Sequence, residues 1–186
     1  MKSLKSTGLL LAAVFVFNVS FGQMEEKTVE VGGAPMYASK NIVENAVNSK
    51  DHTTLVAAVK AAGLVETLMS AGPFTVFAPT NAAFGMLPAG TVESLIKPEN
   101  KAKLTGILTY HVVAGKLDAD ALKAKIKEGK GTAELTTVAG GKLWVMKKDG
   151  KLWLKDENGG MAEITIKDVY QNNGVIHVID HVVLPK

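Results

Sequence analysis

Histidine is the residue type in this chain best suited to catalysis or metal binding, because a neutral imidazole accepts a proton or binds a metal near pH 7. The chain has four histidines. His177 and His181 share one face of a predicted strand, but their backbones lie roughly 13 Å apart at about 3.3 Å per residue, too far for shared coordination without further ligands. Asp180 and His181 are adjacent and should point to opposite faces, so no catalytic dyad is expected. We expect His177 to be hydrogen-bonded in the core and His52 to be solvated in a turn.

Other signatures of catalysis are missing from the sequence. There is no Gly-x-Ser-x-Gly elbow, His-Glu-x-x-His zinc helix, Gly-x-x-x-x-Gly-Lys-Ser/Thr phosphate loop or Gly-x-Gly-x-x-Gly dinucleotide loop. The lack of cysteine excludes disulfides, thiolate metal sites and cysteine nucleophiles. We therefore expect no enzyme activity, no cofactor and no metal site. One alternative stays open, a carrier that binds a small ligand, a metal or haem through histidines and methionines.

Two tryptophans offer a different chemistry, stacking against sugar rings. They end a repeated Gly-Lys-Leu-Trp segment, and Asp149-Gly150 between the copies predicts a hairpin with a two-residue turn. Both faces of this hairpin are apolar, so we expect it to pack on both sides. Two tryptophans on one face of a hairpin more often pack in the core, but a flat indole can also stack against a pyranose ring. The alternation of side chains places Trp144, Met146 and Trp153 on one face and Leu143, Val145, Leu152 and Leu154 on the other.

The charge distribution argues against nucleic acid as a partner. Without Lys2 and Lys5, 19 lysines remain against 18 acidic residues, so the rest of the chain has a formal charge of about +1. The chain contains no arginine, the residue that grips phosphates and guanine edges with two parallel hydrogen bonds.

The N-terminal residues resemble a secretory signal peptide. Lys2 and Lys5 precede an apolar run over 8–17, and Ser20-Phe21-Gly22 supplies the small-x-small spacing that signal peptidase accepts. The run is shorter than the roughly 20 residues that span a bilayer. We expect residues 1–22 to be removed near Gly22, giving a secreted or periplasmic protein without a transmembrane segment.

The elements that must position these residues form one domain. We expect residues 23–38 to be a tail or linker, because charge, Gly32-Gly33 and Pro35 interrupt any apolar period, and residues 39–186 to form the domain. Apolar spacing predicts helices over 42–47, 55–62, 64–70, 91–96, 98–108 and 118–127, with a further turn of helix capped by Thr80 or Asn81. Strands are predicted over 74–78, 110–113, 133–138, 142–147, 151–155, 162–167 and 174–184. Helices first and strands last favour an α+β fold over a doubly wound sheet.

Three of these segments together resemble the fasciclin domain family. FTVFAPTNAAF (74–84) looks like the first signature of the family, YHVV (110–113) like its tyrosine-histidine motif, and NGVIHVID (173–180) like its second signature. The helical segment before them is similar too, so the resemblance covers residues 39–186. It implies a helical layer with two short β-sheets packed as a wedge.

The resemblance also implies a function. Fasciclin domains are typically extracellular adhesion modules, not enzymes, that bind matrix, surface glycans, receptors or one another. In animal members adhesion has been linked to the tyrosine-histidine segment and to an acidic-hydrophobic motif before the last signature. Tyr110 and His111 match the first and Asp168 occupies the place of the second, so these three are the candidate contacts for a protein or polysaccharide surface or for self-association. Internal hydrogen bonding is the alternative role for all three.

Overall fold

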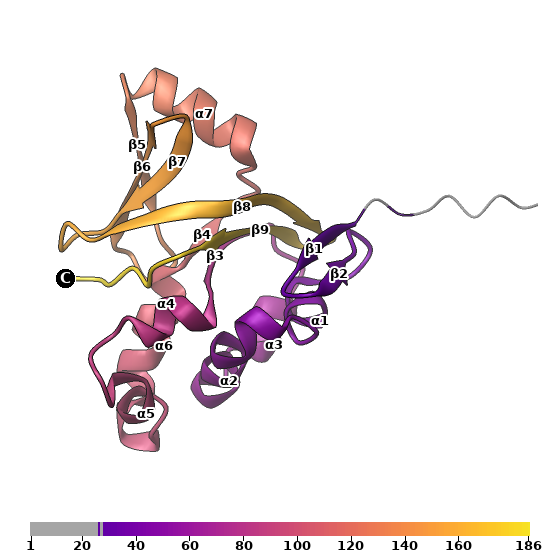
Figure 1. Cartoon of the computed structure of the whole chain (residues 1–186), viewed down its shortest axis with the longest axis vertical. Coiled ribbons are helices and arrows are strands. Elements are labelled where there is room, and N and C mark those ends of the chain that lie inside the picture. The colour runs from indigo at the N-terminus through magenta and orange to yellow at the C-terminus, as the bar shows by residue number, and fades with distance from the viewer. Residues whose placement is uncertain (1–25, 27) are drawn as a thin grey trace, which may run out of the picture.

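The computed structural model describes residue 26 and residues 28–186 (Figure 1). The predicted signal peptide therefore lies outside the described residues. No helix in the described part has the length and apolar character needed to cross a membrane.

Short helices are the main elements of the described chain up to Glu128. Gly63 ends the second of them with a left-handed φ of 74°, as expected, and the Thr80 hydroxyl caps the fourth by accepting a hydrogen bond from the Ala83 N–H at 3.2 Å. The described α-helices are α1 (Ile42–Ala46), α2 (Thr53–Ala62), α3 (Val65–Met69), α4 (Asn81–Gly85), α5 (Thr91–Leu95), α6 (Lys101–Tyr110) and α7 (Ala119–Glu128), with 3₁₀ turns η1 (Lys50–His52) and η2 (Pro98–Asn100).

Seven strands form one sheet, and five of them follow α7 in the chain. Its strand order is β4-β3-β9-β8-β7-β6-β5, with β3 and β9 parallel and the other neighbours antiparallel. The strands are β3 (Phe74–Pro79), β4 (Val112–Ala114), β5 (Thr132–Thr136), β6 (Lys142–Lys148), β7 (Lys151–Lys155), β8 (Met161–Gln171) and β9 (Gly174–Ile179). The α+β class is confirmed.

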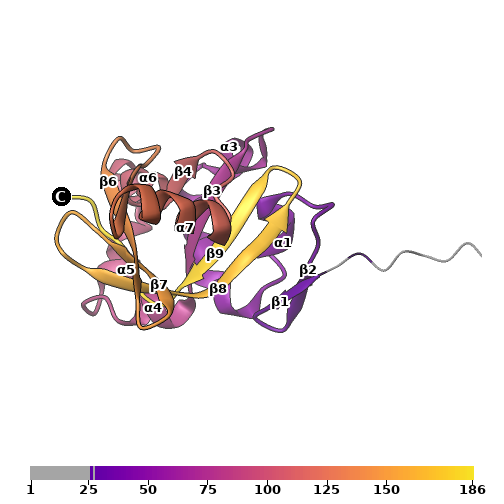
Figure 2. The ribbon, with the colours of Figure 1, turned by 90° about the horizontal axis from the view of Figure 1, so that it is seen from above.

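The long strand β8 joins the two halves of this sheet. Seen from above, β8 runs beside β9 and continues toward β7 (Figure 2). Its register against β9 shifts between Ile164 and Ile166 and again between Ile166 and Val169, and such irregularities bend a strand. The two expected sheets are therefore halves of one bent sheet. A bridge from Val113 to Thr137 brings the far edges of the two halves together.

The buried strands β3 and β9 separate two apolar cores. Val76 and Ile176 pack into the first core, under helices α1 to α6, whereas Phe77 and Ile179 pack into the second, which α7 covers. The expectation of a strand at 74–78 buried on both faces is confirmed, since alternate side chains of β3 enter different cores.

Three expected boundaries were wrong. Part of the proposed tail at 23–38 is folded: β1 (Val29–Val31) and β2 (Ala34–Met36) form a hairpin whose Val31 and Met36 are buried in the first core. The expected strand at 110–113 begins only at Val112, because α6 continues through Tyr110. The last strand ends at Ile179 instead of Leu184.

The hairpin of β6 and β7 has the predicted register, with Lys148 opposite Lys151. The expectation that it packs on both sides was wrong. Leu143, Val145 and Leu154 are fully buried against α7, but Trp144 and its neighbours on the other face are only half-buried.

Candidate functional site

Tyr110, the first predicted contact residue, is fully buried at the end of α6. Its hydroxyl donates to the Lys142 carbonyl at 2.5 Å and accepts from the Glu157 N–H at 3.2 Å. Burial raises the pKa of Tyr110 to about 12. The side chain thus ties α6 to β6 and to the turn after β7, and it offers no surface to a partner in this conformation.

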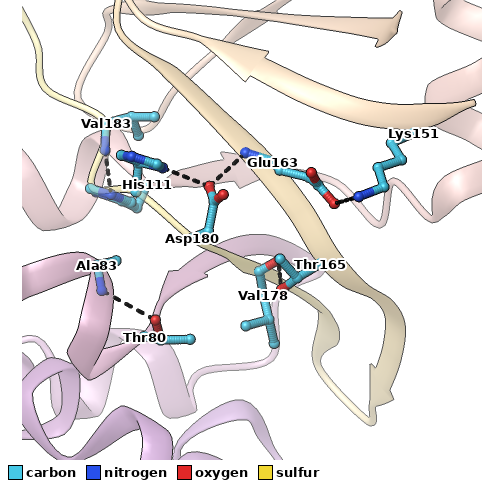
Figure 3. A network of polar contacts seen from close by, with 10 residues as sticks. Thr80, Ala83, His111, Lys151, Glu163, Thr165, Val178, Asp180 and Val183 are labelled. Carbon is cyan, nitrogen blue, oxygen red and sulfur yellow. Dashed lines mark hydrogen bonds and ion pairs between the residues drawn. The ribbon is translucent and has the colours of Figure 1, made fainter. Parts of the chain in front are cut away.

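His111 is the C-cap residue of α6 and is 2% exposed. Its Nδ1–H donates to the Ile107 carbonyl at 2.8 Å. Its Nε2 accepts from the Val183 N–H at 3.2 Å, as Figure 3 shows. These partners fix a neutral imidazole with the proton on Nδ1. Burial lowers the pKa of His111 to about 4.

Asp168, the third predicted contact residue, lies half-buried at an irregularity in β8 with a φ of 60°. Its Oδ1 accepts from the N–H of Ala119, the first residue of α7, at 2.6 Å. Its own N–H donates to Nδ1 of His177 at 3.3 Å, and Nε2–H of His177 donates to the Leu117 carbonyl at 2.8 Å. Asp168 therefore holds the start of α7 onto the sheet, and no hydrogen bond among the described residues joins it to Tyr110 or His111.

The remaining histidines correct two expectations. His52 is 2% exposed, not solvated, and its Nδ1 lies 2.9 Å from the Ser49 hydroxyl. Nδ1 of His181 contacts Oδ1 of Asp180 at 2.8 Å, although the two were expected to point apart. The reason is that β9 ends at Ile179, so strand alternation no longer governs them. Figure 3 shows Asp180 also receiving the Glu163 N–H, at 2.7 Å, and no Ser or Thr hydroxyl of the described residues bonds to His181.

Asn173 was missed as a structural residue. It is 5% exposed, and its amide accepts from the Ile42 N–H at 3.0 Å and donates to the carbonyls of Leu68 and Ser70 at 2.8 and 2.9 Å. The dipeptide Asn173-Gly174 signals a turn, but nothing local in the sequence reveals that this side chain joins α1 and α3 to the sheet.

The described residues contain no group of three or more His, Cys, Asp or Glu side chains that could hold a metal ion. They do enclose an apolar cavity of about 70 Å³ between helices α1 to α3 and strands β3 and β9, with Leu55, Val59, Leu68 and Val76 among its lining residues. That volume is well below the roughly 300 Å³ at which binding pockets for drug-sized molecules begin, so haem does not fit.

One face of β5, β6 and β7 lies opposite the face that α7 covers, and we call it the ribbon face. Trp144 lies opposite Lys155 and Met146 lies opposite Trp153. The ribbon face consists of Thr132, Glu134, Trp144, Met146, Lys148, Lys151, Trp153 and Lys155. α7 packs on the opposite face of the same strands, and no described helix packs on this one.

A hollow of about 410 Å³ borders Trp144 on the ribbon face. Thr132, Met146, Lys155 and the turn over residues 156–159 line it. The indole N–H of Trp153 is buried and has no acceptor among the described residues, and the ammonium of Lys148 lies 5.7 Å from the centroid of that indole. Trp144 is thus the indole that faces an open space.

Comparisons with known proteins agree with this architecture. The chain is 49% identical over 181 residues to Protein sll1483 of Synechocystis sp., which covers 96% of this chain and 93% of the relative. It is 37% identical over 145 residues to Immunogenic protein MPB70 of Mycobacterium bovis, which covers 75% of this chain and 66% of the relative. The fold is similar to that of a FAS1 domain pair from the insect cell adhesion molecule fasciclin I, with a TM-score of 0.70 at 16% identity over 86% of this chain and 58% of that one.

The sequence model of the fasciclin domain matches residues 50–185. This range contains all three motifs on which the resemblance depends, together with the ribbon face. The chain belongs to the fasciclin domain family.

Proposed function

We propose that this protein is a secreted or periplasmic binding module that attaches non-covalently to a protein or polysaccharide surface, after cleavage of its first residues near Gly22. The family supports this proposal, since a solved structure with a similar fold comes from a cell adhesion molecule. The apolar run at 8–17 behind two lysines supports export.

The main support for the proposal is that the histidines of the family motifs form hydrogen bonds within the fold. His111 and His177 are buried and neutral, and both ring nitrogens of each are in hydrogen bonds with other parts of the fold. A ring in that state has no free nitrogen for proton transfer or for metal coordination. These two histidines therefore stabilise the fold, and the proposed activity is binding by an outer surface.

Binding to surfaces is the direct test. The purified protein is incubated over a concentration series with whole bacterial cells and with their separated polysaccharide and protein fractions, and bound protein is measured after washing. Saturable binding to at least one fraction is expected. Absence of binding to every fraction, with circular dichroism showing the folded protein, would contradict the proposal.

Whether the protein self-associates determines whether it can bridge two surfaces. One binding face attaches to one surface, so bridging two surfaces requires a second copy or a second site. Light scattering on the same samples gives the mass in solution and distinguishes attachment by monomers from bridging by oligomers.

A second candidate, a carrier of a small apolar molecule, is supported by the cavity of about 70 Å³ under α1 to α3. Such cavities stay dry and take apolar guests. A short aliphatic alcohol should then raise the melting temperature saturably, and Ala46→Leu, which extends a side chain from the cavity wall, should remove the effect. An unchanged melting temperature at every alcohol concentration would exclude this candidate.

A further inference from the structure

Both tryptophans of the chain lie on the ribbon face. They occupy diagonal positions on β6 and β7, since Trp144 is opposite Lys155 and Trp153 is opposite Met146. Diagonal neighbours of this kind are roughly 7–8 Å apart. Two flat apolar surfaces at that spacing, on a rigid sheet, can each contact one ring of an extended polymer.

Two ion pairs on and around this face are formed within the protein. Lys142 pairs with Glu134 at 2.9 Å, and Lys151 pairs with Glu163 at 2.7 Å. Lys148 and Lys155 of the ribbon face are in no ion pair with a described residue, but Asp156 and Glu157 in the adjoining turn balance their charge. The face and its surroundings together therefore have little net charge with which to select an ionic ligand.

The acidic residues of the adjoining turn are occupied in the same way. Asp156 accepts hydrogen bonds from the N–H groups of Asn158, Gly160 and Leu184. Glu157 accepts from the N–H groups of Lys142 and Lys186. These carboxylates shape the wall of the hollow and are already engaged before any ligand arrives.

Unused hydrogen-bonding groups remain beside Trp144. The Thr132 hydroxyl and the Lys155 ammonium form no side-chain hydrogen bond with any described residue, and both line the hollow. Asn158 uses its amide N–H groups on the carbonyls of Leu184 and Pro185, which leaves its side-chain oxygen as an acceptor. An open indole, a hydroxyl, an ammonium and an amide oxygen around one hollow match the alternating C–H faces and hydroxyl edges of a sugar.

We propose that the ribbon face binds an uncharged polysaccharide, with a pyranose ring against the indole of Trp144 and its hydroxyls bonded by Thr132, Lys155 and Asn158. This inference rests on the proposed function and names its ligand class and its site. Trp153 lies at the diagonal position, where the Lys148 ammonium covers its indole, so Trp144 provides the stacking contact. Stacking and hydroxyl contacts do not depend on ion release, so binding should change little between low and high salt, in contrast to binding of an anionic polymer.

Affinity measurements on matched variants test this site. Binding of the purified protein to laminarin and dextran, both uncharged, and to alginate, which is anionic, is measured at two salt concentrations. Trp144→Ala should weaken binding to the uncharged polymer about tenfold or more, as expected for an aromatic anchor, whereas Trp144→Phe should keep most of it. Met86→Ala is the control, because Met86, the residue after α4, is 57% exposed and lies outside the ribbon face, so affinity should stay unchanged.

Fluorescence gives a second measurement that does not depend on truncating Trp144. In Trp153→Phe, Trp144 is the one tryptophan of the chain, so its emission should change saturably when laminarin is added. Lys155→Gln provides a variant on the exposed rim that should weaken binding severalfold without affecting folding.

Three results would overturn the site: binding to alginate alone, binding of Trp144→Ala equal to that of the wild type, or surface binding that protease treatment of the surface abolishes. In the last case the proposed function stands and the ligand is a protein. Failure to bind any polysaccharide or any surface fraction would overturn both proposals.

Discussion

Tyr110 and Trp144 are both aromatic residues that border the start of β6, yet they are used in opposite ways. Tyr110 is fully buried and its hydroxyl is bonded on both sides, whereas Trp144 is half-buried beside a hollow of about 410 Å³. The first belongs to a motif that identifies the family, and the second lies outside all three motifs.

The difference shows what the motifs do in this fold. Tyr110, His111, Asp168 and Asn173 each connect elements far apart in the sequence through buried or half-buried hydrogen bonds. A group of this kind specifies how the helices dock on the sheet. The ribbon face has no such connecting role, so its side chains are free to select a ligand. The following substitutions test whether the buried motif residues and the ribbon face differ in this way.

Truncation of Tyr110 should have the largest effect on stability. Tyr110→Ala leaves a large cavity in the second core and should lower the free energy of unfolding by about 4 kcal/mol. Tyr110→Phe, which removes only the hydroxyl, should cost roughly 1–2 kcal/mol, because the Lys142 carbonyl and the Glu157 N–H lose their partner. Urea denaturation measures both. A wild-type midpoint for Tyr110→Phe would show that this hydroxyl does not join the elements as described.

Acid should weaken the buried core through His111. Its pKa is about 4 in the folded state and 6.5 as the ordinary value, so the unfolded chain binds a proton first as the pH falls. The stabilisation is complete above pH 6.5 and is lost progressively down to pH 4, a difference on the order of 3 kcal/mol. Burial also lowers the pKa of His177 and His52, which adds to the same trend. Stability measured from pH 7 to pH 4 should fall less steeply in His111→Gln, and an equal slope would contradict the assignment.

Removal of the Asn173 amide should detach the first helices from the sheet. Asn173→Ala leaves the Ile42 N–H and the Leu68 and Ser70 carbonyls without their partner, at a cost of roughly 2–3 kcal/mol. Hydrogen exchange should then increase most in α1 and α3. Asn172→Ala is a matched control, because Asn172 is exposed and its side chain bonds only the Ser39 carbonyl.

The rim of the hollow should show the smallest effect on stability. Lys155→Gln should change the free energy of unfolding by less than about 0.5 kcal/mol, because Lys155 is exposed. The same substitution should weaken binding to an uncharged polysaccharide. A large loss of stability would show that the ribbon face stabilises the fold as the buried motif residues do.

Much of the fold follows from local sequence patterns. The buried strand at 74–78, the left-handed end of α2 at Gly63 and the register about Asp149-Gly150 all depend on residues close in sequence, and each was confirmed. The hairpin of β1 and β2 was missed because its strands have three residues each and its burial depends on distant helices.

The site was harder to predict than the fold. Strand alternation placed both tryptophans on one face, but it cannot tell which face α7 covers. The expectation that His52 is solvated failed for a similar reason, since the polar residues around it suggested solvent while tertiary packing buried the ring. The roles of Tyr110, His111 and Asp168 as contacts stay a prediction, and any partner would have to reach side chains that bond internally in this conformation.

Chemical-shift mapping by NMR tests the division between core and ribbon face most directly. The two indole N–H signals report on Trp144 and Trp153, and the amides of residues 107–113 report on the tyrosine-histidine segment. On titration with laminarin we expect the Trp144 indole and the β6 and β7 amides to shift saturably while residues 107–113 stay unchanged. Chemical-shift changes confined to residues 107–113, with both indole signals unchanged, would show instead that the polysaccharide binds at Tyr110 and His111.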